Sequence, residues 1–306
     1  MQMMTKPAWM KKAIWSAVST GDERRRQVTG VVTLLHALRT TLPAVGLQVW
    51  RGSLVLADYI MREQDAGRWH DVHALELGAG AGLAGLIMAR HASRVWFTDY
   101  DDEVLANCEK NGQLNRHLFA HEDVVRVRKL DWLAPPPAWF RASPTNAAEP
   151  AVRPAADHSG DEAAGPPYEW TQADVAECQR ISVLLAADVI YEDHLTTALF
   201  GLLEYCSRPI TVGGEMLRGD RVLVLSIEKR INFTLEDLAP TSKAYDHFRS
   251  FFVDLDAEPC CSSSPPKPRP RPRLEGRRID VADVPQRFDY ERVAELELWT
   301  LRLARS

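Results

Sequence analysis

Two segments of this chain, residues 181–187 (ISVLLAA) and 221–227 (RVLVLSI), are almost continuously apolar. Runs of this kind are typical of parallel strands in a sheet that helices cover on both faces. Other apolar segments, which we predict as strands, alternate along the chain with amphipathic segments, which we predict as helices. The other predicted strands are 73–77, 94–98, 124–130 and 296–303. In the last of these, the spacing of the leucines indicates a one-residue slip. The predicted helices are 50–61, 83–90, one that contains Val104, Leu105 and Cys108, and 195–205. This alternation predicts an α/β fold with one mostly parallel sheet and helices on both faces.

Two stretches interrupt the alternation. Residues 134–167 are rich in Pro, Ala and Gly, which predicts a flexible insertion. Residues 259–276 (PCCSSSPPKPRPRPRLEG) place prolines between basic residues, which predicts an extended and solvated loop. We therefore expect an N-terminal extension, residues 1–44, followed by a single domain, residues 45–306, that carries both insertions.

Composition excludes several classes of protein. The chain has 37 Lys and Arg against 42 Asp and Glu, a net charge of −5, which is not that of a uniformly basic nucleic-acid-binding protein. No apolar run reaches the roughly 20 residues of a membrane-spanning helix, and the first residues lack the apolar stretch of a secretory signal. The five cysteines form no CxxC pair, which disfavours structural zinc and a disulfide framework. We expect a protein of the cell interior with no metal site.

A glycine-rich turn at residues 75–82 (LELGAGAG) follows one predicted strand and opens a predicted helix. Glycines at such a turn let the backbone approach a ligand, and the helix N-terminus offers unpaired N–H groups. The glycines of residues 80–85 satisfy the GxGxxG spacing of dinucleotide sites, but the pattern fails when it starts at Gly78, the first glycine after the strand. Glu76 is unfavourable beside a diphosphate and suits an ammonium group, such as that of S-adenosylmethionine. The turn therefore predicts a nucleotide-type cofactor, with an ordinary tight turn as the alternative.

Polar and aromatic residues stand at the ends of three further predicted strands. Asp99 follows the second strand, where a carboxylate can accept both hydroxyls of a ribose; a helix cap is the alternative. Asp131 and Trp132 follow the third strand, where they can contact the adenine amino group and ring face or simply pack in the core. Asp188 and Tyr191 follow the fourth strand and would face the reactive end of a cofactor, because ligands of such sheets lie beyond the carboxyl ends of the strands.

These motifs, together with VWRGSLVLADYI (49–60), LDW (130–132) and ADVIY (187–191), resemble the seven-β-strand protein-lysine methyltransferases of methyltransferase family 16. Their order and their position at strand ends are specific, although no single motif is. The resemblance extends from about residue 45 to the C-terminus, apart from the two Pro-rich insertions, and residues 226–238, 244–252 and 291–299 strengthen it. It implies a Rossmann-like class I methyltransferase fold with a seven-stranded sheet in a single domain.

The resemblance also implies roles for the candidate residues, apart from Glu76 and Asp131, whose roles come from the chemistry given above. The cofactor-binding candidates are Trp50 (near the cofactor), Glu76, Gly78, Ala79 and Gly80 (methionine portion), Asp99 (ribose), Asp131 and Trp132 (adenine) and Ala187 (backbone beside the sulfonium). The catalytic candidates are Asp188 and Tyr191, which match a DxxY element that helps to place the substrate lysine. The cofactor is S-adenosyl-L-methionine, and no metal is implied.

We therefore expect a protein-lysine N-methyltransferase of the nucleus or cytoplasm, whose partner is a protein substrate, such as a nucleic-acid-associated protein. We expect no direct contact with nucleic acid or membrane. A small-molecule methyltransferase, a nicotinamide-dependent oxidoreductase and a non-catalytic adaptor are the alternatives. Substrate recognition by Glu228, Lys229, Arg230 and Asn232 is a further hypothesis, with a solvated loop as its alternative. The basic segment 265–278, with Arg277 and Arg278, is either a solvated linker or a patch for nuclear import or an anionic partner.

Overall fold

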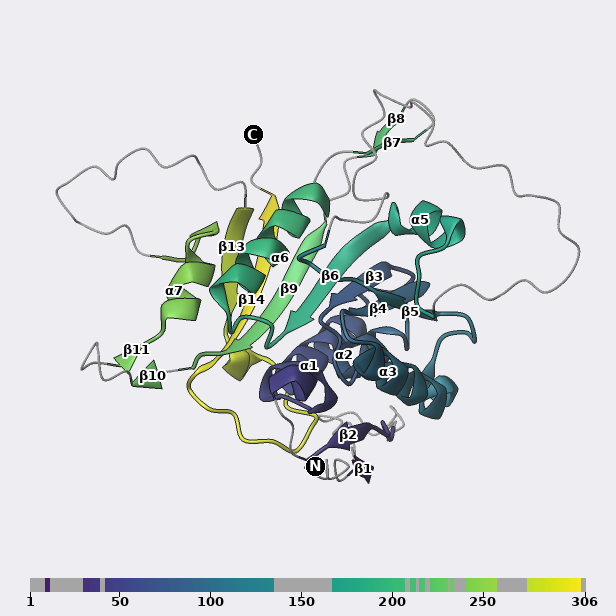
Figure 1. Ribbon diagram of the computed structural model, residues 1–306, viewed down its shortest axis with the longest axis horizontal. Helices are drawn as coiled ribbons and strands as arrows, with labels where there is room; N and C mark the ends of the chain where they lie inside the picture. Colours follow the sequence, from purple (N-terminus) through teal and green to yellow (C-terminus); the bar gives the residue numbers. More distant parts are fainter. Residues whose placement is uncertain are drawn as a thin grey trace, which may run out of the picture.

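An eight-stranded sheet forms the centre of the molecule (Figure 1). The computed structural model describes residues 9–11, 30–38, 42–134, 167–206, 210–212, 215–217, 221–230, 232–233, 240–257 and 274–303. The strand order is β12 (Phe252–Asp254), β13 (Leu274–Ile279), β14 (Leu296–Leu303), β9 (Val222–Glu228), β6 (Ile181–Ala187), β3 (His73–Leu77), β4 (Arg94–Asp99) and β5 (Val125–Lys129). β14 is antiparallel to both of its neighbours, and every other pair in this sheet is parallel.

Helices cover both faces of this sheet, as the alternation of apolar segments predicts. One apolar cluster joins the sheet to α1 (Arg51–Asp65), α2 (Leu83–Met88) and α3 (Asp102–Leu114). A second cluster joins the opposite face to α5 (Gln172–Cys178), α6 (Asp193–Cys206) and α7 (Lys243–Arg249). The α/β fold with a mostly parallel, doubly covered sheet is therefore confirmed.

Several small elements lie outside these layers. They are the 3-10 helices η1 (Leu42–Leu47), η2 (Arg116–Leu118) and η3 (Val281–Asp283), and the two-stranded sheets of β1 (Trp9–Lys11) with β2 (Leu35–Ala37), β7 (Ile210–Val212) with β8 (Glu215–Leu217), and β10 (Asn232–Phe233) with β11 (Pro240–Thr241).

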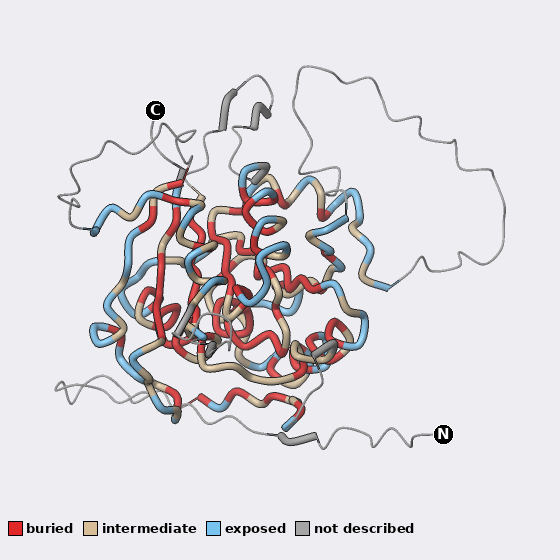
Figure 2. The backbone as a smooth tube through the Cα atoms, turned by 60° about the vertical axis from the view of Figure 1, so that its left-hand side comes forward, coloured by how far each residue is buried: buried red, intermediate tan, exposed pale blue. Residues whose placement is uncertain are grey.

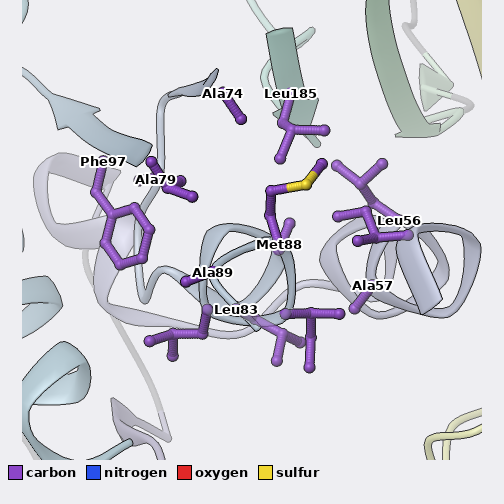
Figure 3. Packing of buried hydrophobic residues seen from close by; sticks show 14 of the residues in the cluster. Leu56, Ala57, Ala74, Ala79, Leu83, Met88, Ala89, Phe97 and Leu185 are labelled. Atoms are coloured by element: carbon purple, nitrogen blue, oxygen red, sulfur yellow. The ribbon is translucent and has the colours of Figure 1, made fainter. Parts of the chain in front are cut away.

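Part of the core lies where α1 and α2 pack on the middle of the sheet. Figure 2 shows the buried backbone concentrated in the central strands and in the helix faces turned toward them. In Figure 3, Met88 of α2 lies between Leu56 of α1 and Leu185 of β6, and all three side chains are completely buried. Burial of side chains of this size contributes about 1.5–3 kcal/mol each. This packing holds the start of α1 and the glycine-rich turn close to the same sheet edge.

The strand order reverses between β3 and β6. From β3 the chain moves outward through β4 to β5, and it then returns to β6 and continues in the other direction to β9. Ligands of open α/β sheets bind beyond the carboxyl ends of the strands at such a reversal. We therefore expect a ligand-binding site at the edge formed by the ends of β3, β4, β5 and β6.

The predicted strand count is wrong by one, because the sheet has eight strands and not seven. The two strands that the sequence did not reveal are β13 and β12, a short edge strand that pairs with it. β13 itself begins at Leu274, inside the segment predicted as a solvated loop, and Leu274 is buried there. The sequence of β13 is charged and lacks the apolar pattern of a buried strand. Its position in the sheet depends on backbone pairing with β14.

Arg277 and Arg278 are therefore strand residues and not part of a basic loop. Arg277 pairs with Asp256 at 3.4 Å, and Arg278 pairs with the buried carboxylate of Glu297 at 3.3 Å. The remainder of the 259–276 segment up to residue 273, and residues 135–166 of the first predicted insertion, lie outside the described residues.

The predicted slip within residues 296–303 is also wrong. β14 pairs with β9 in one continuous antiparallel register. Leu298 packs in the cluster on one face, and Trp299 and Leu301 pack in the cluster on the other. The change in leucine spacing therefore reflects a strand buried on both faces.

Residues 30–38 are held against α3 by side-chain amides. Asn115 accepts from the Thr33 N–H at 2.8 Å and donates to the Thr33 carbonyl at 2.7 Å. Asn111 accepts from the Leu35 N–H at 2.7 Å and donates to the carbonyls of Leu35 and Ala81 at 3.1 and 2.9 Å. Asn111 thus links this early segment to the glycine-rich turn.

Candidate active site

A cavity of about 600 Å³ opens at the carboxyl ends of β3, β4, β5 and β6. All of the catalytic and cofactor-binding candidates lie in its wall: Trp50, Glu76, Gly78, Ala79, Gly80, Asp99, Asp131, Trp132, Ala187, Asp188 and Tyr191. They come from segments up to 141 positions apart (191 − 50), so the sheet topology brings them together. Their individual roles remain predictions.

The glycine-rich turn forms the floor of this cavity. Gly78 and Gly80 have φ angles of +66° and +55°, which side chains other than glycine rarely adopt. A Cβ at Gly80 would lie 2.9 Å from the carbonyl oxygen of Gly46, and a Cβ at Gly78 would lie 2.9 Å from Val189 Cγ1 and 3.5 Å from the Trp132 ring. The turn therefore has no room for side chains, and its backbone is open to the cavity.

Glu76 lies at the end of β3 and is 2% exposed. One oxygen, Oε2, accepts a hydrogen bond from the Gly85 N–H in the first turn of α2 at 2.9 Å. Burial raises the pKa of Glu76 to about 8, although that hydrogen bond opposes the shift. A buried carboxyl in this state strongly favours a nearby cation, because the cation would stabilise the ionised form.

Asp99 ends β4 with its carboxylate fixed by backbone N–H groups. Oδ2 accepts from Gly80 at 3.1 Å and Oδ1 from Tyr100 at 2.8 Å, and burial raises its pKa despite these bonds. The cap of α3 is Asp101, which accepts from the N–H groups of Glu103 and Val104. Asp99 is therefore not the helix cap, and its oxygens retain lone pairs for hydroxyl donors.

Trp132 and Asp131 border the cavity beyond the end of β5. The Trp132 ring is half-buried beside Gly78, whereas Asp131 is exposed and accepts from the Leu133 N–H at 2.9 Å. The indole thus presents a flat apolar surface next to the glycine-rich turn.

Trp50, Asp188 and Tyr191 border the cavity near the end of β6. The Trp50 indole N–H donates to the carbonyl of Val45 at 3.0 Å, and Tyr191 is 36% exposed. Both Asp188 oxygens accept backbone hydrogen bonds at 2.7 Å, one from Gly52 and one from Glu228. Burial raises the pKa of Asp188, an effect that the two hydrogen bonds oppose.

Three residues of the proposed recognition segment have different partners in the structure. Arg230 lines the cavity, with its guanidinium 5.1 Å from the centre of the Trp50 ring. Glu228 pairs with Arg51 at 2.7 Å, and Lys229 pairs with the buried Glu297 at 2.6 Å. The structure does not describe the side chain of Asn232.

Sequence reasoning missed part of the wall. The missed part includes a segment in and just after η1 that crosses the glycine-rich turn: Val45, Gly46 and Gln48. Glu192 and His194, which pair at 3.1 Å, also contribute to the wall. The Pro and Gly of residues 42–47 signal a turn, but nothing in the sequence places that turn over a strand end 30 residues later.

The described residues offer neither a cluster of metal ligands nor a membrane-spanning helix. They contain no group of three or more His, Cys, Asp or Glu side chains placed to hold a metal ion. Among them, no helix has both the length and the apolar character needed to cross a membrane.

Comparison with known proteins confirms the resemblance seen in the sequence. Residues 33–145 match the family described as lysine methyltransferase. The chain is 35% identical over 283 residues to methyltransferase-like protein 22 of Homo sapiens, covering 92% of this chain and 60% of the relative. The corresponding values for the Mus musculus protein are 36%, 274 residues, 89% and 59%. The chain thus spans about three fifths of the length of the curated relatives it matches.

A more distant sequence relative is protein-lysine N-methyltransferase rrg1 of Schizosaccharomyces pombe. It is 30% identical over 118 residues, which cover 36% of this chain and 38% of that protein. Among solved structures, a SAM-dependent methyltransferase from Agrobacterium tumefaciens has a TM-score of 0.42 and 12% identity, covering 97% of this chain and 72% of that chain. A structural likeness this remote carries no argument about the site.

Proposed function

Because residues 33–145 match the lysine methyltransferase family, we propose that the chain is an S-adenosylmethionine-dependent protein-lysine N-methyltransferase. The observation that carries the proposal is one cavity that combines a glycine-rich turn, a fixed strand-end carboxylate and an aromatic opening. Gly78, Asp99 and Trp132 provide these features, and Trp50 and Tyr191 line the same cavity.

In this proposal residues along the carboxyl edge of the sheet would hold the cofactor. Gly78, Ala79 and Gly80 contact its methionine portion, and Glu76 faces the ammonium group. Asp99 accepts the ribose hydroxyls, as its remaining lone pairs allow. Asp131 and Trp132 contact the adenine, and the backbone of Ala187 lies beside the sulfonium.

S-adenosylmethionine supplies an electrophilic methyl group, so the protein must align an uncharged amine with it. A free lysine has a pKa of about 10.4, and burial can lower it by several units. Trp50 and Tyr191 would enclose the lysine side chain and exclude water from it. Alignment of this kind is the main requirement of a direct displacement. The proton of the amine leaves to solvent.

The setting and the partner belong to the same proposal. We place the protein in the nucleus or cytoplasm and its target lysine on a protein, such as a nucleic-acid-associated protein, without direct nucleic-acid binding. These statements are supported by the family resemblance. Imaging of a tagged protein in cells tests the first of them, and an exclusively extracellular or organellar signal would refute it.

Transfer of a labelled methyl group tests the activity. Purified protein and labelled S-adenosylmethionine are added to an extract of cells that lack the protein, and mass spectrometry locates the methyl group. We expect label in a protein band on a lysine, and none with Asp99→Ala. The matched control is Asp123→Ala, because that side chain is 79% exposed.

Other outcomes separate the alternatives. Label in a small molecule would support a small-molecule methyltransferase. A folded protein that binds neither S-adenosylmethionine nor S-adenosylhomocysteine in calorimetry would refute the proposal, and affinity for a nicotinamide dinucleotide instead would favour an oxidoreductase. Cofactor binding without turnover would favour a non-catalytic adaptor.

A further inference from the structure

Asp188 connects three elements at the reactive end of the cavity. Its Oδ2 accepts from the Gly52 N–H of α1, and its Oδ1 accepts from the Glu228 N–H at the end of β9, both at 2.7 Å. Its own N–H donates to the Ser226 carbonyl at 2.9 Å, and the Ser226 hydroxyl donates to the Gly52 carbonyl at 2.7 Å. We call these contacts among Gly52, Asp188, Ser226 and Glu228 the α1 joint.

Asp188 supplies the N-terminal cap that α1 lacks locally. Trp50 occupies the N-cap position and makes no side-chain capping bond. The first N–H groups of a helix have no partner inside the helix, and a negative charge there is favourable. The carboxylate of Asp188, 136 positions away in the sequence, provides both the acceptor and the charge at Gly52.

The fit around Gly52 leaves no room for a side chain at that position. A Cβ at that position would lie 2.5 Å from Asp188 Oδ2 and 2.8 Å from Oδ1. Asp188 itself has a φ of +54°, a left-handed conformation that costs free energy for a residue other than glycine. Strain of this kind persists where the surroundings determine the conformation, and here the backbone bonds to β9 and α1 determine it.

Residues on either side of the α1 joint line the cavity. Trp50 lies two positions before Gly52 and lines the cavity. Arg51 pairs with Glu228, and Arg230, two positions further, places its guanidinium over Trp50. A shift of α1 relative to β9 would therefore move Trp50 and Arg51 together and change the contact between the Trp50 ring and Arg230.

We propose that Asp188 is a positioning residue: it fixes the start of α1 against β9, and so sets Trp50 where the incoming lysine is aligned, and does not itself take up the lysine proton. This inference rests on the proposed function. It rests on the backbone hydrogen bonds that both carboxylate oxygens accept at 2.7 Å, because these bonds favour the ionised carboxylate and would weaken if it took up a proton.

Hydrogen exchange tests the α1 joint without any substrate. In Asp188→Asn the amide offers only one acceptor and turns an NH2 group toward an N–H donor. We expect the Gly52 or Glu228 amide to exchange at least about tenfold faster than in the wild type, the change expected when a bond of this class is lost. Unchanged protection at both amides would overturn the inference. S-adenosylhomocysteine binding verifies that each variant is folded.

Methyl transfer into extract protein then separates positioning from proton uptake. Ser226→Ala removes the Ser226–Gly52 bond and leaves the carboxylate in place, and Gly52→Ala displaces the carboxylate. We expect both to reduce the rate, Gly52→Ala by as much as about 100-fold, because a misplacement near 1 Å can have that effect. The matched control is Gly201→Ala, since a Cβ there meets nothing within 4 Å, and it should keep the wild-type rate.

The pH dependence of the rate decides between the two roles. If Asp188 positions α1, then Asp188→Asn, Gly52→Ala and wild type share the same rise with pH and differ only in height. Loss of that rise in Asp188→Asn alone would show proton uptake by Asp188 and overturn the inference, as would wild-type rates in both Ser226→Ala and Gly52→Ala. Absence of transfer by the wild type would refute the proposed function instead and leave the exchange result intact.

Discussion

The raised pKa of Glu76 predicts that cofactor affinity increases with pH. The ligand-free carboxyl has a pKa of about 8, caused by burial. The ammonium group of S-adenosylhomocysteine favours the ionised form, so binding must displace the proton. About 3% of Glu76 is ionised at pH 6.5 and about 75% at pH 8.5, which predicts an affinity gain of about 25-fold between these values.

Isothermal titration calorimetry of S-adenosylhomocysteine at pH 6.5, 7.5 and 8.5 measures this gain. Repeating the titration in two buffers of different ionisation enthalpy should reveal the release of about 0.8 proton per ligand near pH 7.4. Glu76→Gln is the matched variant, because its carbonyl oxygen can still accept from Gly85 and hold α2. It should bind more weakly, with little dependence on pH.

Two results would refute this reasoning. Wild-type affinity that stays constant or falls between pH 6.5 and 8.5 would show that Glu76 does not ionise on binding. An equal pH dependence in Glu76→Gln would assign the proton to another group. Either result would remove Glu76 from the contacts of the ammonium group while leaving its role at the start of α2 unaffected.

Three further predictions concern stability and binding. Asp58→Ala should lower the free energy of unfolding by about 3–5 kcal/mol in urea titrations, because the Asp58 carboxylate is completely buried and accepts four hydrogen bonds. The control is Asp65→Ala, which should lower it by less than about 1 kcal/mol because the Asp65 side chain is 60% exposed. Equal losses in the two variants would contradict the prediction for Asp58. Asn111→Ala should cost about 1–3 kcal/mol and also weaken S-adenosylhomocysteine binding, since Asn111 holds the Ala81 carbonyl; a stability loss without weaker binding would exclude that coupling. Gly80→Ala should reduce cofactor affinity more than about tenfold, because strain of 1–3 kcal/mol accompanies its φ, and near-normal affinity in calorimetry would show that the turn can relax.

The central strands of this fold could be predicted from the sequence because their pattern arises from burial alone. Residues 181–187 read as a two-sided buried strand, and β6 has the same bounds. β13 could not be recognised in this way, because it is a charged segment held by backbone pairing with β14. Backbone hydrogen bonds leave no pattern in the side chains, so a strand of this kind is found only once its neighbour is placed.

The same distinction applies to the cavity. Asp99, Trp132 and Tyr191 could be anticipated because each follows a recognisable strand, and parallel strands end at one edge. The approach of Gly46 to Gly80 could not, since it is made by a carbonyl and a glycine. The hydrogen-bond partners of Asp188 could not be predicted either, because they are main-chain N–H groups from α1 and β9.

The position of β14 has a consequence for how the chain is made. β14 is the last strand of the sheet in sequence, yet it lies between β9 and β13. During synthesis on the ribosome, the edge of β9 that pairs with β14 has no partner until residues 296–303 have been made. An unpaired edge of an apolar strand can pair with another chain. Chaperone protection during that interval would therefore matter more for this protein than for one whose sheet is assembled in sequence order.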